Sequence, residues 1–257
     1  MITKDIHFNS EQGLNHSGKE GRKTTIEPGY HQIISTISHE LRTPVAIIKS
    51  NIQLLREFNY EIDPLVLEES FSLCNDSVDE VVRFLDNIQW LNRSTKLGHH
   101  PTYLSFGVKR IIHHLYARLA SMNLDFHRIV LQWDLKDHDI ISDKQYLRQV
   151  LLNVLSNALK FSNGKVQLII STSNGQLSIK VQDRGIGIPE DDMELIFQPF
   201  YRASNAKHIS GTGLGLAIVH SMVENLGGKI QVASSMGEGS TVKIMIPYET
   251  SSQNSSN

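Results

Sequence analysis

Two consecutive runs of apolar residues with a period of 3.5 constrain the fold of this chain more than any other feature. Each run makes six steps over 21 residues: Ile34, Ile37, Leu41, Val45, Ile48, Ile52 and Leu55, then Leu67, Phe71, Cys74, Val78, Val81, Leu85 and Ile88. This period is typical of helices that supercoil around partner helices. The break between the runs is short and contains Pro64, so we expect an antiparallel helical hairpin.

A hairpin of two helices has too few layers to enclose a core by itself. Two copies that associate as a four-helix bundle would bury both apolar seams. We therefore expect residues 28–96 to form an all-α hairpin, and two chains to form a homodimer through a dimeric four-helix bundle. The alternative is a monomeric hairpin that packs on the rest of its own chain.

The pattern changes after residue 96, and 257 residues are enough for two domains. We interpret residues 97–102 as a linker, residues 103–248 as a second domain, and the polar segments 1–27 and 249–257 as disordered. We expect helices at 108–122, 144–161 and 214–225, and strands at 129–133, 166–171, 177–182, 229–233 and 240–246. Asn174 and Gly175 indicate a tight hairpin. This order predicts an α/β fold of the α+β sandwich type, with helices on one face of a mixed sheet.

Composition excludes some classes of function. A net charge of -2 gives no basic field for nucleic acid. The single cysteine, Cys74, excludes an intramolecular disulfide and suits a reducing compartment. No run approaches the roughly 18 apolar residues of a spanning helix. We expect a cytoplasmic chain without membrane insertion, whose input comes from a sensory partner or from a sensor region outside this chain.

His39, in the string SHELRTP, is the strongest candidate for a nucleophile. It lies two residues from Ile37 and from Leu41, about 200° round a helix from either, so its ring should point to solvent. A neutral imidazole keeps one ring nitrogen with a free lone pair. Thr43, one turn on, should share the face of His39, and Pro44 should kink the helix there.

The string HELRTP, followed by a hairpin of period 3.5, resembles the H-box of the dimerisation and histidine-phosphotransfer domain of two-component sensor histidine kinases. The resemblance implies that His39 is phosphorylated and that Glu40 assists removal of its proton. It also implies that Thr43 orients water when the enzyme dephosphorylates its partner.

The segment QVLLNVLSNALKFS carries two asparagines one helical turn apart, Asn153 and Asn157, with Lys160 three residues further on. On a helix these polar side chains gather on one side. An amide oxygen is a suitable hard ligand for Mg²⁺. Two solvated asparagines would be the preferred reading if this segment stood alone.

Two glycine-rich segments follow. In VQDRGIGIP, Gly185 and Gly187 permit a close approach of the backbone to a ligand. In GTGLGLAIV, Gly211, Gly213 and Gly215 precede a helix, whose N-terminal amides would bind the anionic phosphates of a nucleotide.

In this order, the three segments resemble the boxes of the Bergerat-type ATP-binding fold of histidine kinases, gyrase-like topoisomerases and Hsp90-like chaperones. The resemblance assigns Mg²⁺ to Asn157 and the adenine amino group to Asp183. Residues 196–202 lie in a long polar segment between the glycine boxes, and a loop of this length in a compact domain is usually functional, so we expect a mobile lid over ATP there. It implies ATP binding by Asn153, Asn157, Lys160, Phe161, Asp183, Gly185, Gly187, Gly211, Gly213, Leu214 and Gly215. Arg184 stands where the family usually has asparagine.

Particular residues exclude the other nucleotide-binding folds. Leu216 occupies the last position of a G-x-G-x-x-G motif, and the chain contains no G-x-x-x-x-G-K-[ST], HRD or DFG string. The resemblance implies an ATP-dependent protein histidine kinase that phosphorylates His39 and transfers the phosphoryl group to an aspartate of a response-regulator receiver domain. A non-catalytic dimeric ATP-binding adaptor is the alternative. The H-box disfavours an ATPase of the chaperone or topoisomerase type.

Overall fold

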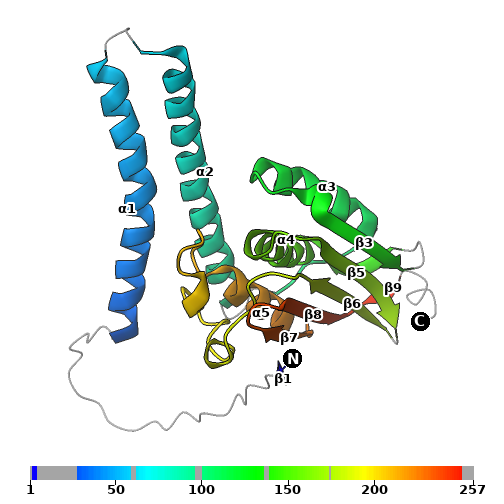
Figure 1. Cartoon of the computed structure of the whole chain (residues 1–257). Helices are drawn as coiled ribbons and strands as arrows, with labels where there is room; N and C mark the ends of the chain where they lie inside the picture. Colours follow the sequence, from blue (N-terminus) through cyan, green and yellow to red (C-terminus); the bar gives the residue numbers. More distant parts are fainter. Residues whose placement is uncertain are drawn as a thin grey trace. The chain divides into compact units, whose positions relative to one another are not determined.

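The computed structural model describes residues 2–4, 28–58, 62–95, 100–135, 139–173 and 175–250. The chain divides into two compact units, one within residues 7–88 and one that combines residues 1–6 with residues 89–257 (Figure 1). The expected linker at 97–99, most of the expected disordered ends, and part of the turn before Pro64 lie outside the described residues.

Two long helices form the predicted hairpin, α1 (Pro28–Glu57) and α2 (Pro64–Thr95). The start of α2 follows from its first residues, because Pro64 suits the first helical position and Asp63 caps the helix. The Asp63 carboxylate accepts a hydrogen bond from the Leu65 backbone N–H at 2.8 Å. α1 continues through Pro44, which has no N–H to donate to the Glu40 carbonyl. Within the described residues, no helix combines the length and the apolar content that a bilayer span requires.

The apolar seam predicted on α1 divides into two stripes. Ile37, Leu41 and Ile48 are partly buried and Pro44 is fully buried, whereas Val45 and Ile52 are about half exposed. Successive residues on a helix are 100° apart, so Val45 lies one step round from the buried Pro44.

The seam on α2 divides in the same way. Its covered stripe contains Ser70, Cys74, Ser77, Val81, Phe84 and Ile88. Phe71, Val78 and Leu85 lie one step round from it and remain 46–52% exposed. Small side chains on the covered stripe allow a close helix approach, and the Cys74 thiol lies 4.0 Å from the Ile48 carbonyl oxygen. A single chain therefore covers only part of each seam, and the predicted burial of the rest by a second chain stays a prediction.

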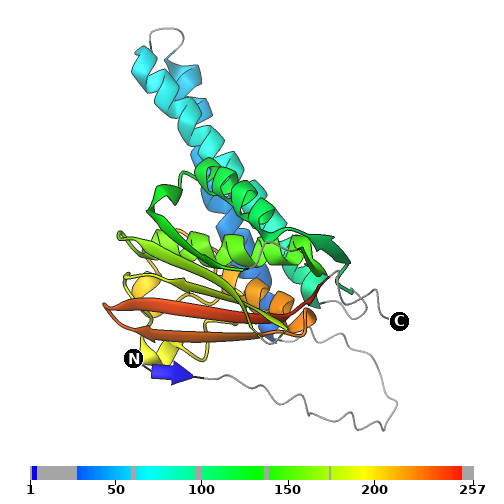
Figure 2. The same ribbon diagram turned by 90° about the vertical axis from the view of Figure 1, so that its right-hand side faces the viewer.

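The second unit is built on a mixed six-stranded sheet in the order β1-β7-β8-β6-β5-β3 (Figure 2). Its strands are β3 (Ile129–Asp134), β5 (Val166–Ser173), β6 (Gln176–Gln182), β7 (Lys229–Ser235) and β8 (Gly239–Pro247), with β1 (Ile2–Lys4) at one edge. β3 and β5 are parallel, and the other neighbours are antiparallel. Ser173 pairs with Gln176, which confirms the tight hairpin predicted there.

Helices α3 (Val108–Ser121), α4 (Lys144–Phe161) and α5 (Gly215–Asn225) cover one face of this sheet (Figures 1 and 2). Alternate residues of β6, Leu177, Ile179 and Val181, point into the core beneath them. This is the α+β arrangement that the sequence predicts.

Side chains cap both ends of α4. At its start, Asp143 Oδ1 accepts hydrogen bonds from the backbone N–H groups of Gln145 and Tyr146 at 2.8 and 2.9 Å. At its end, the Arg128 guanidinium donates to the carbonyls of Ser162 and Gly164 at 2.7 and 2.9 Å. These caps fix the helix that carries Asn153 and Asn157.

Several short strands were not predicted. β2 (Tyr103–Phe106), β4 (Ile140–Asp143) and β9 (Glu249–Thr250) form a separate three-stranded sheet. β1 pairs with β7, so the expectation of disorder does not hold for residues 2–4, nor for 249–250 in β9. In each case the backbone groups find partners on the edge of a distant strand, which local composition does not reveal.

Candidate functional site

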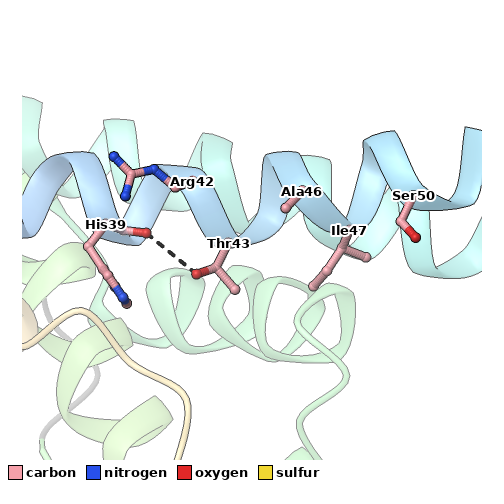
Figure 3. A pocket seen from close by; sticks show the side chains of 6 residues that line it. All are labelled: His39, Arg42, Thr43, Ala46, Ile47 and Ser50. Atoms are coloured by element: carbon pink, nitrogen blue, oxygen red, sulfur yellow. Dashed lines mark hydrogen bonds between the residues drawn. The ribbon is translucent and has the colours of Figure 1, made fainter.

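His39 lies on α1 with an exposed side chain, as the geometry of the helix predicts. The Thr43 hydroxyl, one turn on, donates to the His39 carbonyl at 3.5 Å. Both side chains line an open pocket along α1, together with Arg42, Ala46, Ile47 and Ser50 (Figure 3). The imidazole is thus accessible to a reactant, with a hydroxyl and a guanidinium on the same stretch of helix. Glu40, its neighbour, is partly buried.

In the second unit, α4 and the start of α5 bring the asparagines and the last glycine box together. Asn153 is buried, and its Nδ2 finds no hydrogen-bond partner among the described residues. A Cβ added to Gly215 would lie 3.4 Å from Asn153 Oδ1 and 3.7 Å from Asn157 Nδ2. A buried amide without a partner is costly, so these residues suit a polar ligand such as a phosphate with its metal and water shell.

Asp183 follows β6 and is held by two backbone contacts. Its N–H donates to the Ser240 carbonyl at 2.9 Å, and its Oδ1 accepts from the Gly185 N–H at 2.9 Å. Burial raises the pKa of its carboxyl above the ordinary value, and the hydrogen bond from Gly185 opposes this rise. The result is a fixed, partly desolvated acceptor.

The loop after Asp183 fits closely against its surroundings. A Cβ on Gly185 would lie 2.1 Å from the Phe161 carbonyl oxygen, which accepts a hydrogen bond from the Ile186 N–H at 3.0 Å. Gly187 has φ +66°, and a Cβ there would lie 2.0 Å from the Ser235 carbonyl oxygen. This loop therefore joins the end of α4 to β7.

The start of α5 is suited to an anion. No side chain caps it, and Leu214, directly before it, is fully buried. Gly213 has φ +70°, and the space around a Cβ on Gly211 is open to 4 Å. The first amides of the helix are therefore available to a phosphate group. At the end of α4, Lys160 is exposed and Phe161 partly buried.

Two segments of the chain match the models of known families. Residues 31–95 match the model of the His Kinase A (phospho-acceptor) domain. Residues 142–250 match the model of the histidine kinase-, DNA gyrase B-, and HSP90-like ATPase. The chain belongs to the histidine kinase family. Its fold, a helical region followed by an α/β ATPase-type domain, is that of the family.

Individual histidine kinases are similar over most of this chain. The signal transduction histidine-protein kinase ArlS of Staphylococcus haemolyticus (strain JCSC1435) is 31% identical over 224 residues, which cover 83% of this chain and 48% of ArlS. The chain thus spans about half the length of the curated relatives it matches.

Among solved structures, the Acinetobacter baumannii histidine kinase AdeS has a TM-score of 0.62 and 26% identity, covering 81% of this chain and 97% of AdeS. The histidine kinase ThkA in complex with the response regulator protein TrrA has a TM-score of 0.59 and 23% identity, covering 84% of this chain and 61% of that one. The second comparison supports the fold alone.

Sequence reasoning missed the side chains that shape the segment between the two glycine boxes. Asp192 is 6% exposed and accepts hydrogen bonds from Tyr201 and Ser204. Asn205 Nδ2 donates to the Gly187 carbonyl at 3.0 Å. In the sequence, Asp192 stands in the run EDD, which has the composition of an exposed charged turn. No local signal marks it as buried.

Proposed function

We propose that this chain is the catalytic region of a protein histidine kinase, which moves the γ-phosphoryl group of ATP to His39 and then to an aspartate of a response regulator. The observation that supports it best is the combination of an exposed histidine in a helical H-box with the buried Asn153, beside the glycine box, whose Nδ2 has no hydrogen-bond partner in the described part of the chain. We assign phosphotransfer and dimerisation to residues 28–96 and ATP binding to residues 103–248.

In the first step, a ring nitrogen of His39 attacks the γ-phosphorus of ATP. An N–P bond forms, the bond from the γ-phosphorus to the bridging oxygen breaks, and ADP leaves with the electron pair. The ring loses its N–H proton, and Glu40 is the neighbouring carboxylate that would take it. Catalysis of this kind rests on positioning and charge stabilisation.

For ATP, Asp183 would accept a hydrogen bond from the adenine amino group, a role that guanine cannot satisfy with its carbonyl oxygen. The glycine box and the amides at the start of α5 would bind the phosphates. Lys160 and Phe161 would complete the site at the end of α4. Asn157 would hold Mg²⁺, which neutralises charge on the phosphates, and the unpaired Asn153 amide would support the shell of water and phosphate oxygens.

In the second step, an aspartate carboxylate of the regulator attacks phosphorus, the N–P bond breaks, and His39 recovers a proton. Thr43, on the same stretch of α1, would orient water for the reverse role as a phosphatase. The complex of ThkA with TrrA is that of a histidine kinase with a response regulator, which supports a receiver domain as partner. ATP and such regulators are cytosolic, and we place this chain there.

The exposed apolar stripes support a homodimer. Val45 and Ile52 on α1, and Phe71, Val78 and Leu85 on α2, lie about 100° round each helix from the covered stripe. A helix in a four-helix bundle contacts two neighbours at roughly this angle. The covered stripe thus packs within the hairpin, and the exposed stripe would pack against the second chain.

Incubation with γ-labelled ATP tests the function. We expect acid-labile label on the wild-type chain, none on His39→Gln, and label of normal intensity on His113→Gln, which changes an exposed histidine of α3. Asn157→Ala should also abolish labelling. Absence of label on a wild-type chain that binds AMPPNP would instead support the non-catalytic adaptor.

A further inference from the structure

Residues 201–212, here called the lid loop, begin and end at adjacent positions on the ATP domain. The Phe200 N–H donates to the Gly213 carbonyl at 3.1 Å. Both residues have positive φ, +66° for Phe200 and +70° for Gly213. A Cβ on Gly213 would lie 2.6 Å from the carbonyl carbon of Phe200. The backbone segments at the two ends of the lid loop are therefore in direct contact.

The first half of the lid loop rests on one carboxylate. Asp192, at the end of the short 3-10 helix Glu190–Asp192, accepts hydrogen bonds from the Tyr201 hydroxyl at 2.5 Å, the Ser204 N–H at 2.8 Å and the Ser204 hydroxyl at 2.8 Å. Asp192 is itself buried and anchored, because Met193 and Ile196 beside it pack on Val232 of β7.

The same half of the loop is tied to the adenine side of the site. Asn205, one residue after Ser204, donates to the Gly187 carbonyl at 3.0 Å. Arg202 holds the turn that follows, since its guanidinium donates to the carbonyls of Ala206 and Lys207 at 2.9 Å each. Arg202 also donates to the Ile209 carbonyl, so these contacts hold the lid loop as far as Ile209, whereas the side chains of Lys207 and His208 are exposed.

We propose that Asp192 is a positioning residue for ATP, which holds residues 201–206 in the shape that closes over the phosphates. This inference rests on the proposed function. Asp192 acts through Tyr201 and Ser204, the residue before Asn205, and does not itself contact substrate.

The charge of Asp192 is what makes the contact strong. Three donors surround a carboxylate with little access to water, and hydrogen bonds to an ionised acceptor are about twice as strong as neutral ones. The Tyr201 hydrogen bond holds the pKa of Asp192 below its usual value, so the group is ionised at neutral pH. Without this carboxylate, the free energy of ordering the lid loop would have to come from ATP binding, which would weaken the affinity.

The test compares Asp192→Asn with Asp191→Asn, which removes the same charge from the exposed neighbouring residue. Hydrogen exchange is measured first, on nucleotide-free full-length protein. We expect Asp192→Asn to accelerate exchange in residues 200–213 while β5 and β6 keep wild-type protection. Asp191→Asn should match wild type throughout. Because no nucleotide is present, this measurement does not depend on the proposed function.

Affinity and kinetics are measured next. For Asp192→Asn we expect Kd for AMPPNP and KM for ATP to rise about tenfold, with kcat for His39 labelling within about twofold of wild type. Tyr201→Phe and Ser204→Ala each remove one donor and leave the carboxylate partly paired. They should fold normally and raise Kd by about threefold, which keeps the proposal testable if Asp192→Asn is unstable.

Three outcomes would overturn the assignment of Asp192. The first is exchange in residues 200–213 that is equal in Asp192→Asn and Asp191→Asn. The second is faster exchange spread over the whole sheet, which would show a merely structural role. The third is a lower kcat at unchanged KM. A wild-type chain that binds AMPPNP but does not label His39 would refute the proposed function and leave the exchange and affinity results on Asp192 standing.

Discussion

Gly185 has no room for a side chain, because the Phe161 carbonyl oxygen lies where its Cβ would be. Its importance is steric, and it follows from the contact of the glycine loop with the end of α4. Asp183, two residues earlier, matters for a different reason, since it combines a fixed orientation with burial. Each property leads to its own prediction.

Gly185→Ala should destabilise the ATP domain and abolish AMPPNP binding. The new Cβ would stand 2.1 Å from a backbone oxygen, which cannot rotate away as a side chain can. We expect a loss of about 3 kcal/mol in the free energy of unfolding, measured by urea titration. Gly164→Ala is the control, because nothing lies within 4 Å of a Cβ there. Similar stability of the two variants would contradict the contact with Phe161.

AMPPNP affinity should fall on acidification at a higher pH than an ordinary aspartate would cause. In the proposed site adenine would donate to the ionised carboxylate of Asp183, and burial raises the pKa of that group. Binding is therefore strong above this pKa and is lost as the pH falls through it, by about tenfold per pH unit. Calorimetry between pH 8 and pH 5 measures the effect. Asp183→Asn should bind weakly at all of these pH values, and an equal slope in this variant would assign the titration to another group.

Single residues that belong to a short motif could be picked out from the sequence. Residues whose hydrogen-bond partners are distant in the sequence could not. The sequence marked Asn153, Asp183 and the glycines as candidates because the motifs that contain them are local. It could not identify Asp192, whose three donors come from positions 9 and 12 residues away across a loop.

At the scale of elements, the Arg128 side chain makes most of the side-chain hydrogen bonds at the C-terminal end of α4, where the Ser162 hydroxyl also donates to the Ala158 carbonyl at 2.6 Å. Arg128 comes from the short 3-10 helix Phe126–Arg128, before β3, and bonds to carbonyls of Leu159, Ser162 and Gly164. A guanidinium presents several donors in one plane, which suits three carbonyls at the end of a helix.

Arg128→Ala should lower the free energy of unfolding by about 2 kcal/mol, because the carbonyls it pairs lose a charged donor. Arg128→Lys should recover only part of this, since an ammonium cannot reach all three carbonyls. Urea unfolding measures both effects. Arg148→Ala, an exposed arginine on the same helix, should stay within about 0.5 kcal/mol of wild type. If Arg128→Lys were as stable as wild type, the planar arrangement of the guanidinium donors would not contribute to the stability of the helix end.

Elements with a clear internal period were predictable, and those defined by a distant partner were not. The helix at residues 144–161 and the strands β5, β6, β7 and β8 follow from periodicity and from turn residues. β2 and β4 have four residues each, too few to show a period. The division of each hairpin seam into a covered and an exposed stripe also escaped prediction, because Ser70 and Ser77 do not look like core residues but let the helices approach.

At the scale of the whole molecule, the exposed apolar stripe of the hairpin predicts the assembly. Val78→Asp places a charge in its centre and should convert the proposed homodimer to a monomer, because a desolvated charge without a partner is costly. Ser72→Asp adds the same charge on the polar side, beside the exposed Asp79, and should leave the dimer intact. Sedimentation velocity of the full chain distinguishes them. A monomeric wild type would exclude the four-helix bundle.

The pairing of β1 with β7 has a consequence for how this protein is made. Ile2 lies opposite Ser234 in the finished sheet, yet at about 5–20 residues per second the ribosome needs on the order of 10–50 s to synthesise the chain between them. During that interval the helical hairpin, which needs only neighbouring residues, is free to form. The edge of the sheet that β1 forms can close only after β7 has been made.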